Sequence, residues 1–148
     1  MSAGPRRPPG TAAEPTRLVE LREHADARGG LAVVETGTDV PFPIERVYYL
    51  YGIPQGAERG GHGHRELRQL MIAVHGRLRV TVDDGYRQAS YELDRPGLGL
   101  YIGPMIWRRL THFSPGAVAV VLASAHYDEN DYFREYTEFA RAVRERPS

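Results

Sequence analysis

Two histidines separated by one residue, His62 and His64, have the residue types and spacing in this chain most suited to chemistry. They lie in a glycine-rich stretch that reads as a β-strand, where residues i and i+2 point to the same face. We therefore expect both imidazoles to face one cavity. Imidazole titrates near neutral pH and also ligates metals, so the pair predicts either a metal site or acid–base chemistry. The competing interpretation is that the two rings only fill the interior of a barrel.

The spacing G-x5-H-x-H-x4-Q-x6-G, from Gly56 to Gly76, resembles the first motif of the cupin superfamily. In cupins the position of Gln69 usually holds a metal-binding glutamate, and a neutral amide is a poor ligand. The second cupin motif places a further histidine where this chain has Arg109, whose guanidinium would repel a cation. Because both of these ligand positions are lost, we predict a site without metal that uses the histidines directly.

The composition narrows the class of protein. The chain has 148 residues and a formal net charge of zero, which gives no reason to expect binding to nucleic acid or to a membrane surface. It contains no cysteine, which excludes thiolate catalysis, disulfides and cysteine–zinc sites. Its 19 basic residues are all arginines, which excludes Schiff-base lysine chemistry and suits forked recognition of phosphate. Residues 1–16 lack the apolar core of a secretory signal, so we predict a cytoplasmic protein.

Short apolar runs alternate with turn residues through the middle of the chain, which is typical of an all-β sandwich or barrel. A tail over residues 1–16, rich in proline and glycine, is predicted to be disordered, and residues 17–148 are predicted to form a single domain. Asp83-Asp84-Gly85 predicts a hairpin turn. Strands are expected over residues 17–23, 31–35, 44–52, 68–74, 77–82, 88–93, 98–102, 106–112 and 118–124.

One helix is expected near the C-terminus. Asn130 or Asp131 would cap it. Its packed face would carry residues at helical spacing, namely Tyr132, Tyr136, Phe139 and Val143.

Further segments resemble the sugar 3,4-ketoisomerases, cupins that act on thymidine-diphosphate 4-keto-6-deoxyhexoses. The matching segments are residues 26–31, 44–49, 59–64, 82–85, 99–104 with Trp107, 122–124 and 127–132. The resemblance implies a cupin jelly roll or β-barrel, no metal or other cofactor, and a homodimer, in which the strand 17–23 could add to a neighbour's sheet edge. It implies a metal-independent isomerase of deoxysugar biosynthesis, which moves the carbonyl of a dTDP-4-keto-6-deoxyhexose from C4 to C3.

Such a reaction removes a proton from C3 and delivers one to C4 through an enediol. We assign His64 as first choice for proton transfer at carbon, and His62 as its partner or as a shuttle for protons on the sugar oxygens. Strand alternation puts Arg46 and Tyr48 on one face, where the phenol either binds a developing enolate oxygen or simply packs. Gln69 would face the same cavity as a neutral hydrogen-bonding group.

The diphosphate of such a substrate needs cations, and a guanidinium fits phosphate oxygens in a bidentate manner. We predict that Arg59, just before the histidines, and Arg28, in an Arg-Gly turn, bind it, with Arg46 as a third candidate. Each of these is equally compatible with a solvated surface arginine. Arg109 would affect substrate choice if its side chain faces the cavity, and would have no role if it faces solvent.

Three other functions stay open. A nucleotide-sugar epimerase on the same barrel would also need His and Tyr side chains, and a non-catalytic sugar-binding cupin would bind the ligand unchanged. A metal dioxygenase is disfavoured by Gln69 and Arg109. Incubation with the nucleotide ketosugar separates a shifted carbonyl from an inverted carbon centre and from an unchanged ligand.

Overall fold

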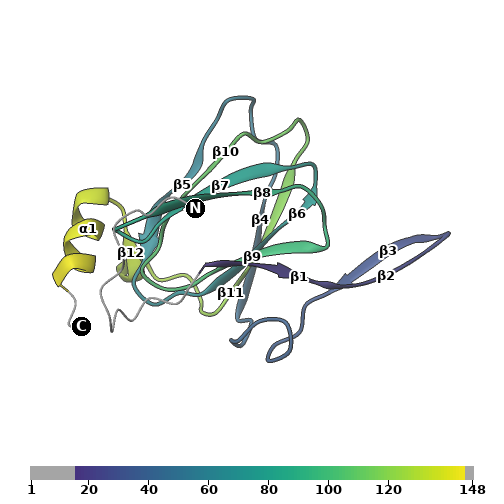
Figure 1. Ribbon diagram of the computed structural model, residues 1–148, viewed down its shortest axis with the longest axis horizontal. Coiled ribbons are helices and arrows are strands. Elements are labelled where there is room, and N and C mark those ends of the chain that lie inside the picture. The colour runs from purple at the N-terminus through teal and green to yellow at the C-terminus, as the bar shows by residue number, and fades with distance from the viewer. Residues whose placement is uncertain (1–15, 146–148) are drawn as a thin grey trace.

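Paired antiparallel strands are the main secondary structure of the computed structural model, which describes residues 16–145 (Figure 1). The predicted all-β fold with a short C-terminal helix is confirmed. The elements in chain order are β1 (Arg17–Glu20), β2 (Arg22–Asp26), β3 (Gly29–Val33), β4 (Arg46–Leu50), β5 (Arg59–His64), β6 (Gln69–His75), β7 (Leu78–Asp83), β8 (Gln88–Leu93), β9 (Leu98–Ile102), β10 (Trp107–Thr111), β11 (Val118–Ala123), the 3-10 turn η1 (Glu129–Asp131), β12 (Tyr132–Phe133) and α1 (Tyr136–Glu145).

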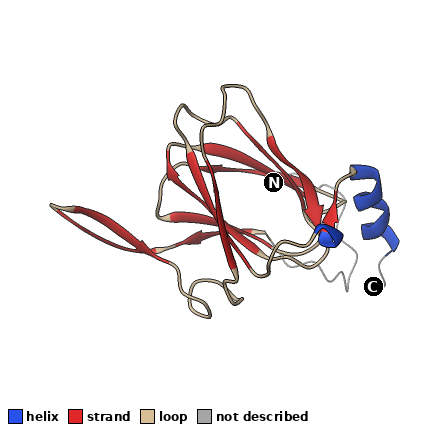
Figure 2. Ribbon diagram, turned by 180° about the vertical axis from the view of Figure 1, so that it is seen from behind, coloured by secondary structure: helices blue, strands red, loops and turns tan. Residues whose placement is uncertain are grey.

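Two five-stranded sheets face each other, as in a jelly roll (Figure 2). One has the strand order β1-β9-β6-β11-β4 and the other β12-β5-β10-β7-β8. Apolar side chains alternate inward along the strands; in β7, for example, Leu78, Val80 and Val82 are buried. They meet residues such as Leu100 and Val121 from the opposite sheet in the main core. The main core therefore fills one part of the space between the two sheets, and the candidate site described below occupies another part.

The outer face of the first sheet is covered by the segment between β3 and β4. Val40 and Phe42 from this segment are almost fully buried, and they pack with Leu70, Ile72 and Tyr101 in a second apolar cluster. The sheet is therefore buried on both faces along β6, which explains why five consecutive residues of β6 are inaccessible to solvent.

The C-terminal helix begins later than its sequence pattern predicts. Neither predicted capping residue starts it: Asp128 caps the short turn η1, and the chain then adds the two-residue strand β12 to the edge of β5. Only Phe139 and Val143 of the predicted stripe are buried by α1. Tyr132 lies before the helix, and its ring lies beside those of His62 and His64. No helix within residues 16–145 is long and apolar enough to cross a membrane.

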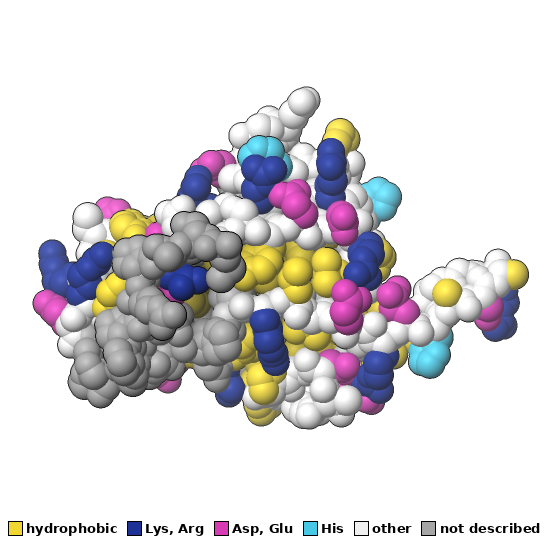
Figure 3. Space-filling model, viewed as in Figure 1, with side chains coloured by type: hydrophobic (Ala, Val, Ile, Leu, Met, Phe, Trp, Pro, Cys, Tyr) yellow, Lys and Arg dark blue, Asp and Glu magenta, His cyan; other side chains and the backbone are white. Residues whose placement is uncertain are grey.

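The first predicted strand is interrupted at Leu21. This side chain turns into the second apolar cluster, and its backbone N–H donates to the Gly97 carbonyl at 2.9 Å. Beyond it, β2 and β3 pair only with each other and form a hairpin that stands clear of the body (Figure 3). Nearly every residue of this hairpin is exposed. Of the predicted disordered tail, residues 1–15 lie outside the described part of the chain.

Candidate active site

A hollow of about 470 Å3 lies between the two sheets. Apolar side chains such as Leu110 and Val121 separate it from the main core. Its remaining wall is polar and strongly basic, because the strands β4, β5 and β10 and the segment after β12 all turn cationic groups toward it. The polar lining comprises Arg46, Tyr48, Arg59, His62, Arg108, Tyr127, Tyr132 and Arg134.

A bulge in β5 brings Arg59 and His62 to the same hollow. In a regular strand, residues three positions apart point to opposite faces. Here His62 pairs with Arg108 and Arg59 pairs with Leu110, so the two glycines between them oppose a single residue of β10. Gly60 has a φ of 91°, which glycine adopts without a Cβ penalty. The glycines therefore set the side-chain directions in this strand.

The two imidazoles are neighbours, but they do not open onto the same space. Their ring centroids are 5.0 Å apart, and the Tyr132 ring lies 5.0 Å from that of His62 and 4.3 Å from that of His64. His62 lines the hollow between the sheets, whereas His64 lines a second hollow of about 480 Å3 that shares Arg46 and Tyr132 with the first. His64 is only 1% exposed. A molecule that enters the first hollow therefore meets His62 first, which differs from the order expected from the sequence.

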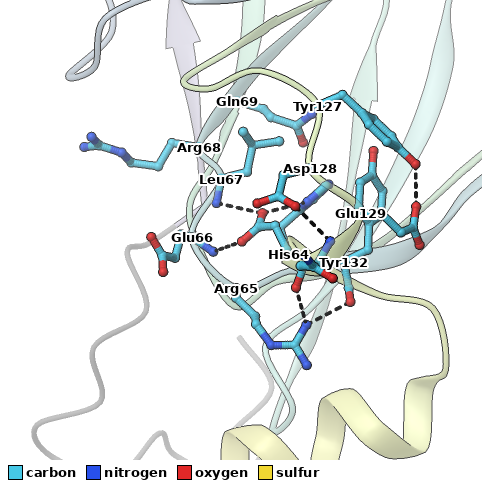
Figure 4. Close-up of polar contacts among 12 residues, drawn as sticks. His64, Arg65, Glu66, Leu67, Arg68, Gln69, Tyr127, Asp128, Glu129 and Tyr132 are labelled. Atoms are coloured by element: carbon cyan, nitrogen blue, oxygen red, sulfur yellow. Dashed lines mark hydrogen bonds and ion pairs between the residues drawn. The ribbon is translucent and has the colours of Figure 1, made fainter.

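Asp131 fixes the orientation of His64. Its Oδ2 lies 3.1 Å from His64 Nδ1, and the same carboxylate accepts the backbone N–H groups of Glu66 at 2.8 Å and Leu67 at 3.3 Å. Figure 4 shows these contacts, which tie the turn after β5 to the segment around η1. The other ring nitrogen, Nε2, is buried without a hydrogen-bond partner among the described residues. Because Asp131 is an acceptor, the proton of a neutral His64 belongs on Nδ1, and the lone pair is on Nε2.

The surroundings of both imidazoles favour their neutral form by lowering the pKa. Burial, followed by the positive charge of Arg108, lowers the pKa of His62 to about 3. The same two causes lower the pKa of His64 to about 2. A neutral imidazole can accept a proton, so both rings are in the form that a general base requires.

A buried hydrogen-bonded chain runs from Arg108 through Gln69 to Tyr48. Arg108 Nη1 donates to Gln69 Oε1, and Gln69 Nε2 donates to the Tyr48 hydroxyl at 2.8 Å. Since the amide holds the phenol oxygen as an acceptor, the Tyr48 proton is free to be donated elsewhere. Burial raises the pKa of Tyr48, so the phenol keeps its proton.

Of the two orientations left open for Arg109, the structure has the one that faces solvent. Its side chain is exposed on the outer face of β10, where Nη1 lies 3.3 Å from Glu58 Oε1. Arg108, the preceding residue, is the one that faces inward, and it is 1% exposed. The sequence itself indicates that Arg108 faces inward. The apolar Leu110 is expected to face the core, and residues i and i−2 in a strand share a face. The inward-facing cation of this strand is therefore Arg108.

The predicted phosphate-binding arginines are only partly brought together. Arg59 and Arg46 both line the hollow, and Arg46 lies over the Tyr48 ring at 5.3 Å. Arg134, which sequence reasoning missed, joins them and is held by Glu129 through contacts of 2.7 and 2.9 Å. Arg28 lies outside this group: it is at the tip of the β2–β3 hairpin, paired with Asp26 at 2.6 Å.

The donor set of the hollow does not suit a metal ion. Among residues 16–145, three or more His, Cys, Asp or Glu side chains do not gather at any point where they could hold one. Two imidazoles that face different spaces, a neutral amide and the fixed charge of Arg108 form a poor environment for a divalent cation. Gln69 is instead occupied by its two hydrogen bonds.

Comparison with known proteins identifies relatives at 36–39% identity that are named as 3,4-oxoisomerases or 3,4-ketoisomerases. The profile of the FdtA family, described as WxcM-like, C-terminal, matches residues 14–144. The TDP-4-oxo-6-deoxy-alpha-D-glucose-3,4-oxoisomerase of Aneurinibacillus thermoaerophilus is 38% identical over 127 residues, which are 86% of this chain and 91% of that protein. A 3,4-ketoisomerase from Helicobacter canadensis superposes with a TM-score of 0.85 at 39% identity, covering 88% of this chain and 98% of its own.

A third relative was solved with a ligand. It is a His-to-Asn variant of the 3,4-ketoisomerase QdtA from Thermoanaerobacterium thermosaccharolyticum, in complex with TDP-4-keto-6-deoxyglucose. It superposes with a TM-score of 0.86 at 36% identity and covers 88% of this chain and 95% of its own.

Proposed function

The chain belongs to the FdtA family, and from this membership we propose that it is a sugar 3,4-ketoisomerase of deoxysugar biosynthesis. It converts a dTDP-4-keto-6-deoxyhexose to the corresponding 3-keto sugar. The observation that carries the proposal is the identity of 36–39% to proteins of this activity along nearly the whole chain, together with a basic hollow that contains an imidazole and a phenol. The epimerase alternative has less support, because these relatives are ketoisomerases.

The reaction is an internal redox exchange that needs no outside oxidant. The C3 proton leaves to a base, its electron pair forms the C3–C4 double bond, and the C4 carbonyl pair moves onto oxygen. The C3 hydroxyl gives its proton to the C4 oxygen, and a proton then adds at C4 as the C3 oxygen becomes the carbonyl. C3 is oxidised, C4 is reduced, and the catalyst supplies only proton transfer and stabilisation of charge.

We assign proton transfer at carbon to His62, because its neutral ring lines the hollow between the sheets. His64 has its Nδ1–H directed to Asp131 and presents Nε2 as a buried acceptor beside His62, so it suits a shuttle for the sugar-oxygen protons. This is the reverse of the order expected from the sequence. Tyr48, whose oxygen accepts from Gln69, donates its hydroxyl proton to a sugar oxygen.

The nucleotide portion is bound by arginines. Arg59 and Arg46 reach the hollow from two different strands, and Arg134 adds a third cation from the segment after β12. Guanidinium groups match the bidentate geometry of phosphate oxygens. A nucleotide-linked substrate also favours the cytoplasm as the compartment of the protein.

We further propose a homodimer. A two-stranded hairpin in water is marginally stable on its own, and β2 and β3 have no other sheet partner within the described residues. A second copy that packs against the hairpin would stabilise it. Within one chain the hairpin carries Arg28 away from the hollow, so any contact of Arg28 with the diphosphate would be at the site of the partner.

The test is turnover of dTDP-4-keto-6-deoxyglucose in deuterated water, followed by NMR. We expect the carbonyl to move to C3 and deuterium to appear at C4. His62→Asn should lower turnover by about 10²–10⁴-fold while the affinity for thymidine diphosphate stays nearly constant. An inverted carbon centre would support the epimerase instead, and binding without conversion would support the non-catalytic alternative.

A further inference from the structure

Arg108 is a buried cation without a carboxylate partner in the described part of the chain. It is the largest of the side chains that are almost completely buried. Nη1 donates to Gln69 Oε1, Nη2 donates to the Ile106 carbonyl at 3.2 Å, and Nε has no acceptor. All of these partners are neutral. The Asp131 carboxylate acts on Arg108 only through space, without a direct contact. A buried charge that is hydrogen-bonded only to neutral groups is costly to folding, so stability alone does not explain why an arginine is present here.

The position of Arg108 supplies that explanation. It lines the same hollow as His62 and Tyr48, and it is paired directly across the sheet with His62. Its positive charge adds to burial in lowering the pKa of His62 and of His64, and it opposes the rise that burial causes in the pKa of Tyr48. A positive charge that favours the deprotonated form of three side chains favours the deprotonated form of a substrate at the same place.

We propose that Arg108 is the group that stabilises the negative charge of the enediolate, and this rests on the ketoisomerase function proposed above. When the C3–H electron pair enters the C3–C4 bond, the C4 carbonyl pair moves onto oxygen and creates an oxyanion. The fixed guanidinium that lines the hollow balances that charge until the C4 oxygen takes up the proton of the C3 hydroxyl, and C4 is then protonated as the C3 oxygen forms the carbonyl. Held by Gln69 and Ile106, the cation needs no reorganisation as the charge develops.

Diphosphate binding is a poor alternative role for this residue. Arg59 and Arg134 are exposed at the hollow and can meet a dianion that keeps part of its hydration. Arg108 is inaccessible to solvent and lies against the inner residues of β10. It therefore suits the sugar-oxygen charge that appears only during the reaction.

The test compares Arg108→Met, which removes the charge at similar volume, with Arg108→Lys, which keeps it. Arg109→Met is the matched control, because it removes the adjacent exposed arginine of the same strand. For Arg108→Met we expect kcat to fall by about 10²–10³-fold, with thymidine diphosphate affinity changed by less than about threefold. Arg108→Lys should retain part of kcat, and Arg109→Met should match the wild type.

Two measurements on the ligand-free protein separate this role from a structural one. The midpoint of thermal unfolding of Arg108→Met should equal or exceed that of the wild type, because an uncompensated buried charge is gone. NMR titration should show the imidazole pKa values of His62 and His64 rising in Arg108→Met and staying constant in Arg109→Met.

The possible failures are distinguishable. A wild-type protein that does not isomerise the ketosugar overturns the proposed function and this inference with it. If the wild type turns over, then unchanged kcat in Arg108→Met overturns the inference alone. Loss of thymidine diphosphate affinity in parallel with kcat would assign Arg108 to binding instead, and a much lower unfolding midpoint would assign it to the fold.

Discussion

Single carboxylate and amide side chains determine whether the imidazole and phenol groups of this site donate or accept protons. Asp131 determines which nitrogen of His64 carries the proton, and Gln69 determines that Tyr48 is a donor. Neither residue needs to touch the substrate to matter. Each acts by fixing the tautomer or the hydrogen-bond direction of a neighbour.

Asp131→Asn should therefore change catalysis through His64. With its oxygen at the Oδ1 position, the Asn still accepts the Glu66 N–H and loses only the longer contact with the Leu67 N–H, so the fold should persist. The amide NH2 would then face Nδ1 and move the imidazole proton to Nε2. We expect kcat to fall by about 10²–10⁴-fold, with the tautomer change visible in the 15N shifts of His64. Glu58→Gln, on the exposed outer face, is the control. An Nδ1–H tautomer that persists in the Asn variant would refute this account.

At the scale of single strands, the alternation rule identified most of the site. It correctly put Arg46 and Tyr48 on one face of β4. In β10, Arg109 was singled out from its position in the cupin motif, whereas alternation from the buried Leu110 indicates Arg108. The contributions of Asp131 and Tyr132 were not predictable in this way. They come from an irregular segment more than 60 residues further along the chain, and their partners are set by tertiary contacts.

The bulge in β5 offers a test at this scale. Gly60→Ala would place a Cβ at positive φ and 2.9 Å from Leu110 Cδ1. Regularising the strand would turn Arg59 away from the hollow, so we expect weaker thymidine diphosphate binding by roughly 10–100-fold, as for loss of one charged contact. Gly61→Ala is the matched control, because its Cβ meets nothing within 4 Å. Calorimetric titration measures both; equal affinities would show that the bulge does not direct Arg59.

For the molecule as a whole, the buried neutral imidazoles predict sensitivity to mild acid. Above about pH 6.5, the imidazoles of His62 and His64 are uncharged in both the folded and the unfolded chain. As the pH falls below that value, both imidazoles become protonated in the unfolded chain. In the folded chain they stay neutral until the pH approaches their lowered pKa values, about 3 for His62 and about 2 for His64. The free energy of unfolding should thus decrease from pH 6.5 to 5 by up to about 1.4 kcal/mol per pH unit for each ring.

Urea denaturation at several pH values between 7.5 and 5 measures this effect. His64→Asn should show a shallower dependence on pH than the wild type. His24→Asn, on the exposed strand β2, should leave the dependence unchanged. Identical slopes in all three proteins would mean that the imidazoles do not remain neutral in the fold.

The proposed dimer can be examined by mixing two inactive variants. If Arg28 acts at the site of the partner, a mixed dimer of Arg28→Ala and His62→Asn contains one site with both native residues. Random exchange of subunits should then restore about a quarter of wild-type turnover. The two variants kept apart are the controls. Absence of recovery, or full activity of Arg28→Ala alone, would exclude a role for Arg28 across subunits.

Trp107 has an optical consequence. It is the single tryptophan of the chain, and its ring packs against Tyr136 and Phe139 of α1, with centroids 5.5 and 5.9 Å away. The next residue, Arg108, points to the opposite side of the same strand. Tryptophan emission therefore reports the contact between α1 and β10, whereas far-ultraviolet circular dichroism reports the sheets. Denaturation curves from the two signals would coincide if helix and sheets melt as one cooperative unit, and the emission curve would lead if α1 detaches first.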